Sequence, residues 1–315
     1  MNAVTDEGRP LLMERDPQLA RLTELLDAGK GRIAVVSGPV AVGKTLLLDT
    51  FTHRVSGGAR VLTATASRTE RDLPMEVVRQ LFAAADPPQQ AAARFARLLD
   101  LAGTAPGPVP IEVLHGVCLE LLALADRPLV VAVDDVHHAD APSLDCLLYF
   151  ARRLRTAPVL LLLTDCALPQ RAHPLFHAEL QRQPHFHGVR LRPLSEAGVA
   201  SLLAAHLDLR TADHVAADVH RVTGGSPLLV RALVDDHLTN GWSDPEGRTL
   251  APGDAFAQAV QSLLYRCDPS VPDVARALAV LDAPASAERV AVLLGRETRA
   301  VARAMSALGA TGLVH

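Results

Sequence analysis

The chain has 315 residues, of which 49% are hydrophobic and 21% are charged, and its formal net charge is −4. This length predicts two or three domains, and the composition excludes a largely disordered protein. The negative charge and the lack of a long run of Lys or Arg exclude a general electrostatic attraction to nucleic acid.

Charged residues near the N-terminus exclude a secretory signal peptide, and no uninterrupted apolar run reaches the length of a membrane span. The four cysteines lie far apart without a Cys-x-x-Cys pair, which predicts buried free thiols in a reducing compartment: Cys118, Cys146, Cys166 and Cys267. We therefore expect a cytoplasmic protein that does not contact a membrane.

The first part of the chain alternates strand and helix patterns. A helix is expected from Asp16, as its N-cap, and Pro17 to about Gly29. The remaining patterns predict strands over 33–37, 61–66, 129–133 and 159–164, and helices over 46–55, 74–84, 89–101, 111–124 and 143–154. This alternation predicts an α/β fold with a parallel sheet flanked by helices, whose ligands bind at the carboxyl ends of the strands.

From about Pro193 onward the patterns are helical alone. Helices are predicted over 196–206, 211–222 and 227–238, with others between 255 and 308, and residues 240–254 read as a loop between two helical parts. The sequence stops at Val314 and His315 without a polar cap, so we expect the chain to be a portion of a longer protein.

A phosphate-binding loop follows the first predicted strand. Gly38 to Thr45 reads Gly-Pro-Val-Ala-Val-Gly-Lys-Thr, and the residues expected to bind nucleotide are Gly38, Pro39, Val40, Ala41, Val42, Gly43, Lys44, Thr45 and Leu46. The glycines let backbone N–H groups turn toward phosphate, Lys44 reaches the outer phosphates, and the Thr45 hydroxyl coordinates magnesium. The loop therefore predicts binding of a nucleoside triphosphate with Mg²⁺. Lys44 is one of only two lysines, the other being Lys30.

Two acidic residues follow the strongly apolar run over 129–133. Asp134, at the end of this strand, is expected to hold the magnesium, and Asp135 to orient or deprotonate the attacking water. The alternative is that both aspartates merely end a strand and open a loop.

His137, His138 and Asp140 follow these aspartates at once. An alternative is that they form a transition-metal site together with the aspartates. We favour magnesium, because carboxylate oxygens bind it well and histidines do not. Two further close pairs have no cysteine or carboxylate at matching spacing and are expected in solvated loops: His173 with His177, and His185 with His187.

Taken together, these motifs make the sequence resemble the large ATP-binding LuxR-type regulators of actinobacteria. These are relatives of the maltose-regulon activator among the signal-transduction ATPases with numerous domains, near the AAA+ proteins. Besides the phosphate loop and the two aspartates, the resemblance rests on Leu12-Met-Glu-Arg15, Glu70-Arg-Asp-Leu-Pro74, Val78-Arg-Gln-Leu81, Leu191-x-Pro-Leu-Ser195 and Thr223-Gly-Gly-Ser-Pro-Leu-Leu229.

The resemblance implies a P-loop nucleotide-binding domain over 1–192, a helical lid over 193–250 and a truncated winged-helix-like domain over 251–315. It implies that the nucleotide is ATP or ADP, that Pro227 packs near the adenine and that Arg15 helps to hold the nucleotide. Three departures from the family pattern stand out. The family usually has Gly at the position of Glu14 and often has Trp at the position of His138. The family also commonly has an arginine after the strand over 159–163 to sense the terminal phosphate, and this sequence has none there.

The function implied is that of a regulatory module in a transcriptional activator, which switches between ADP and ATP, hydrolyses ATP slowly and self-associates on activation. The resemblance implies two further partners. One is an unknown inducer, and the other is DNA, which would be bound by a helix-turn-helix that is absent from these residues. One alternative is a non-hydrolysing scaffold, favoured by the missing arginine. The other is a phosphotransferase, which the all-helical second half does not support.

Overall fold

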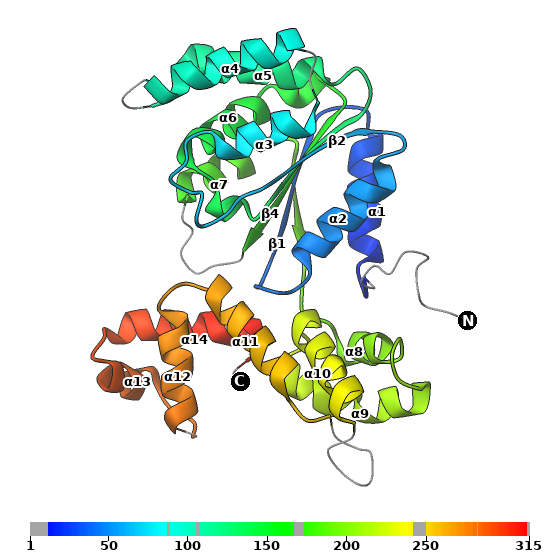
Figure 1. Cartoon of the computed structure of the whole chain (residues 1–315), viewed down its shortest axis with the longest axis vertical. Helices are drawn as coiled ribbons and strands as arrows, with labels where there is room; N and C mark the ends of the chain where they lie inside the picture. The colour runs from blue at the N-terminus through cyan, green and yellow to red at the C-terminus, as the bar shows by residue number, and fades with distance from the viewer. Residues whose placement is uncertain are drawn as a thin grey trace.

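The structure of the chain is a computed structural model, and it describes residues 12–86, 89–104, 108–166, 173–241, 250–281 and 283–313. The first part of these residues forms a sheet with helices on both faces, and the later part forms two groups of helices (Figure 1). The helical groups lie at the end of the sheet from which the phosphate loop emerges.

A parallel sheet of five strands forms the centre of the first part. Its strands lie in the order β2-β3-β4-β1-β5, and every adjacent pair is parallel. The strands are β1 (Arg32–Gly38), β2 (Arg60–Thr65), β3 (Leu129–Asp134), β4 (Val159–Cys166) and β5 (Phe186–Arg190). Because all five run the same way, their carboxyl ends meet at one edge, which confirms the predicted α/β fold.

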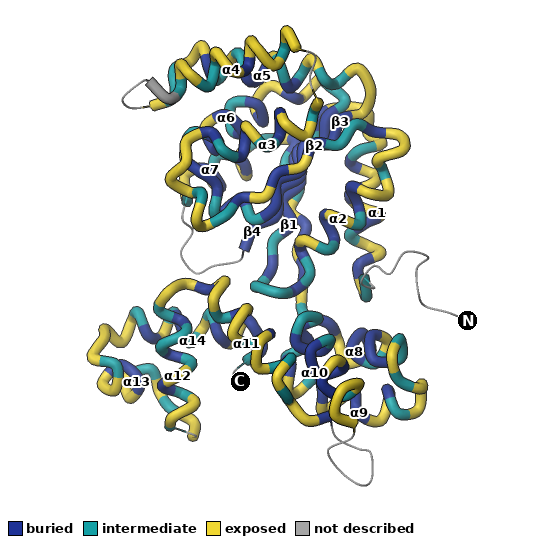
Figure 2. The backbone as a smooth tube through the Cα atoms, viewed as in Figure 1, coloured by how far each residue is buried: buried dark blue, intermediate teal, exposed yellow. Residues whose placement is uncertain are grey.

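Helices cover both faces of this sheet (Figure 1). The helices α1 (Asp16–Asp27) and α2 (Lys44–Val55) pack on one face. The other face is covered by α3 (Glu76–Ala84), α5 (Ile111–Ala123), α6 (Ala141–Ala151) and α7 (Pro174–Gln181), with α4 (Gln89–Thr104) packed on α5. Every residue of β3 and β4 is buried, as expected for central strands covered on both sides (Figure 2).

The later residues form two separate apolar cores. One is built by α8 (Glu196–Leu203), α9 (Leu209–Thr223) and α10 (Pro227–Asn240). The other is built mainly by α11 (Asp254–Arg266), α12 (Val271–Leu281), α13 (Ala287–Leu294) and α14 (Thr298–Thr311). Residues 250–281 and 283–313 contain no strand, so the winged-helix interpretation of this part stays a prediction from the resemblance.

The structure corrects several local predictions. Helix α1 begins at Asp16 itself, and its N-cap is Arg15 without a side-chain cap. The strand β5 and the helix α7 were not predicted. Three of the four histidines expected in solvated loops lie elsewhere: His177 is buried in α7, His187 lies in β5, and His185 is buried in the turn before β5. His173 is the half-buried N-cap of α7.

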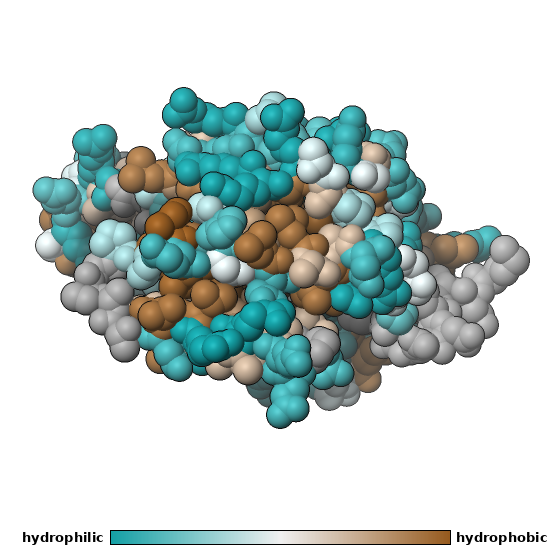
Figure 3. All heavy atoms as spheres, turned by 90° about the horizontal axis from the view of Figure 1, so that it is seen from above, coloured by the Kyte–Doolittle hydropathy of each residue, from teal (hydrophilic) through white to brown (hydrophobic). Residues whose placement is uncertain are grey.

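The end of the molecule covered by α4 and α5 displays apolar side chains among hydrophilic ones (Figure 3). These helices expose Leu101, Ile111 and Leu119. The four cysteines are buried and unpaired with one another. Within the described ranges, none of the helices is both long enough and apolar enough to cross a bilayer.

Candidate functional site

The loop over 38–45 joins the carboxyl end of β1 to the first turn of α2. Two of its residues have the left-handed backbone conformation, with φ of 60° at Ala41 and 95° at Gly43. Gly43 tolerates this angle because it lacks a Cβ atom. The loop therefore wraps around the N-terminus of α2, where backbone N–H groups and the helix dipole favour an anion.

Lys44 lies inside this loop and is 7% exposed. Its ammonium group donates hydrogen bonds to the carbonyl oxygens of Gly38 at 3.2 Å and Pro39 at 2.7 Å. Both acceptors belong to the loop itself, so the charge is held at the centre of the turn. A phosphate entering the loop would meet this charge directly.

Asp134 is held between two hydroxyl groups. The Thr45 hydroxyl donates a hydrogen bond to Oδ2 of Asp134 at 2.7 Å, and the Thr164 hydroxyl donates one to Oδ1. Strand β4 pairs with β3 in the sheet, and this pairing places Thr164 beside Asp134. Thr164 was not singled out in the sequence; its signal was a polar residue that interrupts the apolar run of β4.

Asp135 follows at the edge of the cavity, in the left-handed conformation with φ of 50°. Its backbone N–H donates to the Thr164 hydroxyl at 2.8 Å, which fixes the turn after β3. Burial and then the charge of Asp134 raise the pKa of the Asp135 carboxyl, while Lys44 and Arg266 act in the opposite direction.

These residues line a cavity of about 600 Å³, which lies within the usual range for small-molecule sites. Lys44, Thr45, Asp134 and Asp135 form one side. Three arginines that the sequence did not single out come from other elements: Arg68 after β2, Arg231 from α10 and Arg266 from α11. Their separation in the chain left no local signal, because the sheet brings Arg68 to the cavity and only the packing of the helical groups brings Arg231 and Arg266.

Arg266 is brought to the cavity by a contact between the two parts of the chain. Arg68 donates hydrogen bonds to the carbonyl oxygens of Cys267 at 2.9 Å and Tyr265 at 3.4 Å, at the end of α11. Arg266 lies between these two acceptors in the sequence and lines the cavity. The contact therefore brings a cation of α11 opposite the phosphate loop.

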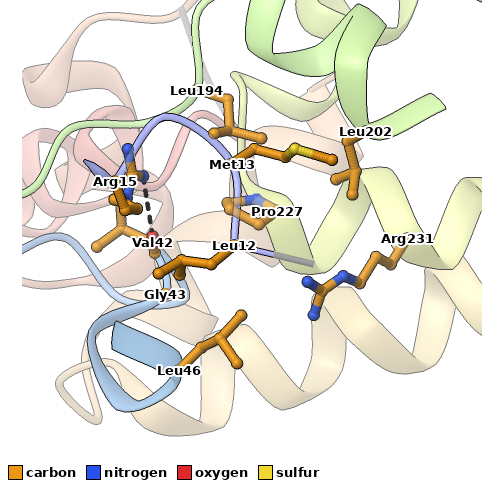
Figure 4. A pocket seen from close by; sticks show the side chains of 10 residues that line it. All are labelled: Leu12, Met13, Arg15, Val42, Gly43, Leu46, Leu194, Leu202, Pro227 and Arg231. Atoms are coloured by element: carbon orange, nitrogen blue, oxygen red, sulfur yellow. Dashed lines mark hydrogen bonds between the residues drawn. The ribbon is translucent and has the colours of Figure 1, made fainter. Parts of the chain in front are cut away.

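A second, smaller pocket lies beside the loop and is lined mainly by apolar side chains (Figure 4). Pro227 and Leu46 line both this pocket and the larger cavity. Its volume is about 20 Å³, which is room for a water molecule and not for a purine. A base beside Pro227 would therefore need the larger cavity or an opening of this pocket.

Arg15 also lines the smaller pocket, and it is only 4% exposed. Its guanidinium donates hydrogen bonds to the carbonyl oxygens of Arg192 at 2.7 Å, Glu14 at 3.1 Å and Val42 at 3.2 Å. Figure 4 shows the bond to Val42. Arg15 thus ties the N-terminal segment to the phosphate loop and to the segment that leads into α8.

Glu14 has φ of 54°, in the left-handed region that glycine adopts without strain and a residue with a Cβ atom does not. Its carboxylate accepts hydrogen bonds from the backbone N–H of Ser195, at 3.0 Å, and from the Ser195 hydroxyl. Ser195 is the N-cap of α8, so Glu14 joins the N-terminal segment to the start of that helix.

The polar residues after Asp135 have different surroundings from one another. His137 and His138 line the large cavity, whereas the Asp140 carboxylate accepts hydrogen bonds from backbone N–H groups of Met75 and Ser143, at the starts of α3 and α6. Among the described residues, no group of three or more His, Cys, Asp and Glu side chains is arranged to hold a metal ion. The hydroxyl of Thr45 and the carboxylate of Asp134 are the hard oxygen donors that suit Mg²⁺, and they are in contact at the mouth of the loop.

Comparisons with known proteins agree with this geometry. A model of the AAA ATPase domain family matches residues 11–162. No curated protein sequence matches the chain. Residues 11–162 are thus an AAA ATPase-like nucleotide-binding module.

Solved structures extend the likeness of the fold to the helical part. The ORC2 protein of Aeropyrum pernix, solved in ADPNP and ADP complexes, has a TM-score of 0.57 and 18% identity, with 98% of this chain and 89% of that chain covered. A signal transduction ATPase with numerous domains from Pyrococcus horikoshii, which carries a tetratricopeptide repeat sensor, has a TM-score of 0.50 and 16% identity. The chain is covered over 97% of its length but spans only 40% of that protein.

Proposed function

We propose that the chain is an ATP- and ADP-binding regulatory module of a signal-transduction ATPase. The observation that carries this proposal is the composition of the large cavity. The phosphate loop and two aspartates form one side of it, and arginines of α10 and α11 reach it from the helical part. A nucleotide bound there would contact both parts of the chain. The sheet with its covering helices would then be the nucleotide-binding domain over 1–192, followed by the lid over 193–250 and the winged-helix-like domain over 251–315.

The proposed reaction is slow hydrolysis of ATP to ADP and phosphate. A water oxygen bonds to the terminal phosphorus as the bond from that phosphorus to the ADP oxygen breaks, and the proton of the water passes to Asp135 and then to phosphate. The raised pKa of Asp135 brings it closer to neutral pH, where a general base is most effective. Lys44 would balance charge on the outer phosphates. A bound Mg²⁺, held by Thr45 and Asp134, would neutralise phosphate oxygens.

The proposed regulation is a switch between two arrangements of the helical part. The bonds from Arg68 to the end of α11 hold a closed arrangement, in which Arg266 faces the cavity. We propose that ADP favours this arrangement and that ATP favours release of α11 and self-association. Such a switch requires that each nucleotide binds one arrangement more tightly than the other, because equal affinity would shift nothing.

A second candidate is a scaffold that binds nucleotide without hydrolysing it. It is favoured by Asp165, an acidic residue, at the end of β4 where the resembled family commonly has an arginine. Asp165 is buried and does not line the cavity, so this position supplies no positive charge to the terminal phosphate. The two candidates differ in turnover and not in binding.

The test begins with denaturation of the purified protein and chromatographic identification of any released nucleotide. Phosphate release from added ATP is then followed in the wild type, Lys44→Ala and Asp135→Asn, with Lys30→Ala as the control because Lys30 is exposed. Bound ADP and slow turnover that requires Lys44 and Asp135 are expected. Bound nucleotide without turnover would favour the scaffold, and neither binding nor turnover would refute both candidates.

The role in transcription rests on the resemblance to LuxR-type regulators and belongs to a longer protein that also carries the DNA-binding helix-turn-helix. Its test uses that full-length protein with ATP, with ADP and with Lys44→Ala. DNA binding that depends on the nucleotide is expected. DNA binding that is the same with ATP, with ADP and in Lys44→Ala would contradict the switch.

A further inference from the structure

Behind the cavity, one buried carboxylate lies between two buried histidines. Asp165 is the next residue after Thr164 in β4 and is 1% exposed. Nδ1 of His137 lies 3.8 Å from one of its oxygens, Oδ1. Nδ1 of His177, from α7, lies 3.5 Å from the other oxygen, Oδ2. One imidazole therefore faces each oxygen of the carboxylate.

This arrangement joins three elements around the turn that carries the catalytic aspartates. His137 belongs to the short 3-10 helix η1 (Val136–His138), directly after Asp135. Asp165 belongs to β4 and His177 to α7. A carboxylate this deeply buried is stable only with hydrogen-bond donors or cations beside it. The Nδ1 atoms of the two histidines lie 3.8 and 3.5 Å from its oxygens, longer than an ordinary hydrogen bond, so a small movement of each ring would bring an Nδ1–H donor to the carboxylate.

His137 also faces the nucleotide cavity, together with Lys44 and Asp135. Its Nδ1 atom is buried on the side of Asp165. Burial, followed by the charges of His138 and Lys44, lowers the pKa of His137 to about 3, so the ring is neutral near pH 7. A neutral imidazole with hydrogen on Nδ1 has a lone pair on Nε2 and can accept a hydrogen bond there.

We propose that Asp165 is a positioning residue that holds His137 with its Nδ1–H toward the carboxylate, so that Nε2 of His137 accepts a hydrogen bond from the attacking water. This inference rests on the proposed hydrolysis of ATP and deepens it. His137 orients the water and takes no proton, which still passes to Asp135 as the phosphorus–oxygen bond breaks. His177 holds the second oxygen of Asp165 and so fixes the direction in which the carboxylate faces His137.

The kinetic test compares the wild type with His137→Asn and Asp165→Asn. Loss of orientation is expected to lower kcat by about 10- to 100-fold, since small misplacements of reacting groups have effects of this order. The affinity for ADP, measured with a fluorescent analogue, is expected to change by less than about threefold because neither side chain is needed to hold ADP. His214→Asn, on an exposed position of α9, is the control. Thermal unfolding checks that each variant folds.

A second readout detects the tautomer directly and does not depend on turnover. Nitrogen-15 NMR of histidine-labelled protein, with the His137 signals assigned by their loss in His137→Asn, reports which ring nitrogen carries hydrogen. Hydrogen on Nδ1 in the wild type is expected, together with a shift toward the other tautomer in Asp165→Asn. Hydrogen on Nε2 in the wild type would overturn the proposal.

The outcomes also separate this inference from the proposed function. A wild type that does not hydrolyse ATP overturns both. Turnover that requires Lys44 and Asp135 but is unchanged in His137→Asn overturns only the role of His137. An equal loss of ADP affinity and kcat would show a binding role and would also overturn the orientation proposed for His137.

Discussion

Thr164 connects the two aspartates at the end of β3, since its hydroxyl donates to Asp134 and accepts from the backbone of Asp135. A valine there has nearly the same shape but offers neither bond. Thr164→Val is therefore expected to lower kcat/KM for ATP by about 10- to 100-fold, the usual effect of losing a side chain that supports a metal ligand. Steady-state phosphate release at varied Mg²⁺ measures the change.

Two variants make this prediction specific. Thr164→Ser keeps the hydroxyl and is expected to retain most of the activity. Thr63→Val, on an exposed position of β2, makes the same chemical change away from the site. Equal activity of Thr164→Val and Thr63→Val would contradict the role given to Thr164.

Lys44 is expected to contribute directly to the binding of ATP. Its ammonium group lies inside the phosphate loop, bonded to two carbonyl oxygens of that loop. Without it, the outer phosphates lose a charge-assisted contact that contributes about 1.5–3 kcal/mol, so Lys44→Ala is expected to bind ATP roughly 10- to 150-fold more weakly. Isothermal titration calorimetry measures the affinity. Lys30→Ala should bind as the wild type does.

Asp140 shows how one side chain can set the position of two helices. Its carboxylate accepts hydrogen bonds from the backbone N–H groups of Met75, Glu76 and Val77 at the start of α3, and from that of Ser143 in α6. Asp140 is 2% exposed, so water cannot replace these bonds. The metal role considered for Asp140 from the sequence is thus replaced by capping of two helix N-termini.

We expect Asp140→Ala to lower the free energy of unfolding by about 2–4 kcal/mol, because two caps of up to about 2 kcal/mol each are lost and buried donors are left unpaired. Urea denaturation followed by circular dichroism measures the change. Asp72→Ala, at an exposed position, is the control. A loss of stability no larger than that of the control would contradict this account of the α3–α6 contact.

At the scale of the whole molecule, one contact between the helical part and the part that contains the sheet lies at the end of α11, beside the nucleotide cavity. Two hydrogen bonds from Arg68 make this contact, and Arg68 is exposed. Bonds of this kind contribute about 0.5–1.5 kcal/mol, so Arg68→Gln is expected to release ADP roughly two- to tenfold faster. Stopped-flow displacement of a fluorescent ADP analogue measures the rate.

Arg299→Gln, at an exposed position of α14, tests whether any loss of an arginine from the surface has this effect. Arg266→Gln is expected to act in the same direction as Arg68→Gln, since it removes the cation that Arg68 helps to place. Unchanged ADP release in both Arg68→Gln and Arg266→Gln would contradict the closed arrangement.

The parts of the fold that could be predicted from the sequence are those that leave a pattern within one short segment. Four of the five strands and the helices between them follow from apolar runs and helical spacing, and the phosphate loop follows from eight consecutive residues. Strand β5 was missed because its burial is low: only Val189 is buried among its five residues. An edge strand paired on one side needs few apolar residues, so its sequence resembles a loop.

The sequence alone thus predicted chemical roles for residues that are close together in the chain. It predicted phosphate binding by the loop that surrounds Lys44, and magnesium binding and water activation by the aspartates that follow an apolar run. The tertiary structure alone decided which distant side chains complete the site. The order of the strands places Thr164 against Asp134, the burial of α7 places His177 against Asp165, and the packing of α11 brings Arg266 to the cavity. Local patterns record the periodicity of one segment, whereas these contacts depend on which segments share a buried surface, and no single segment carries that information.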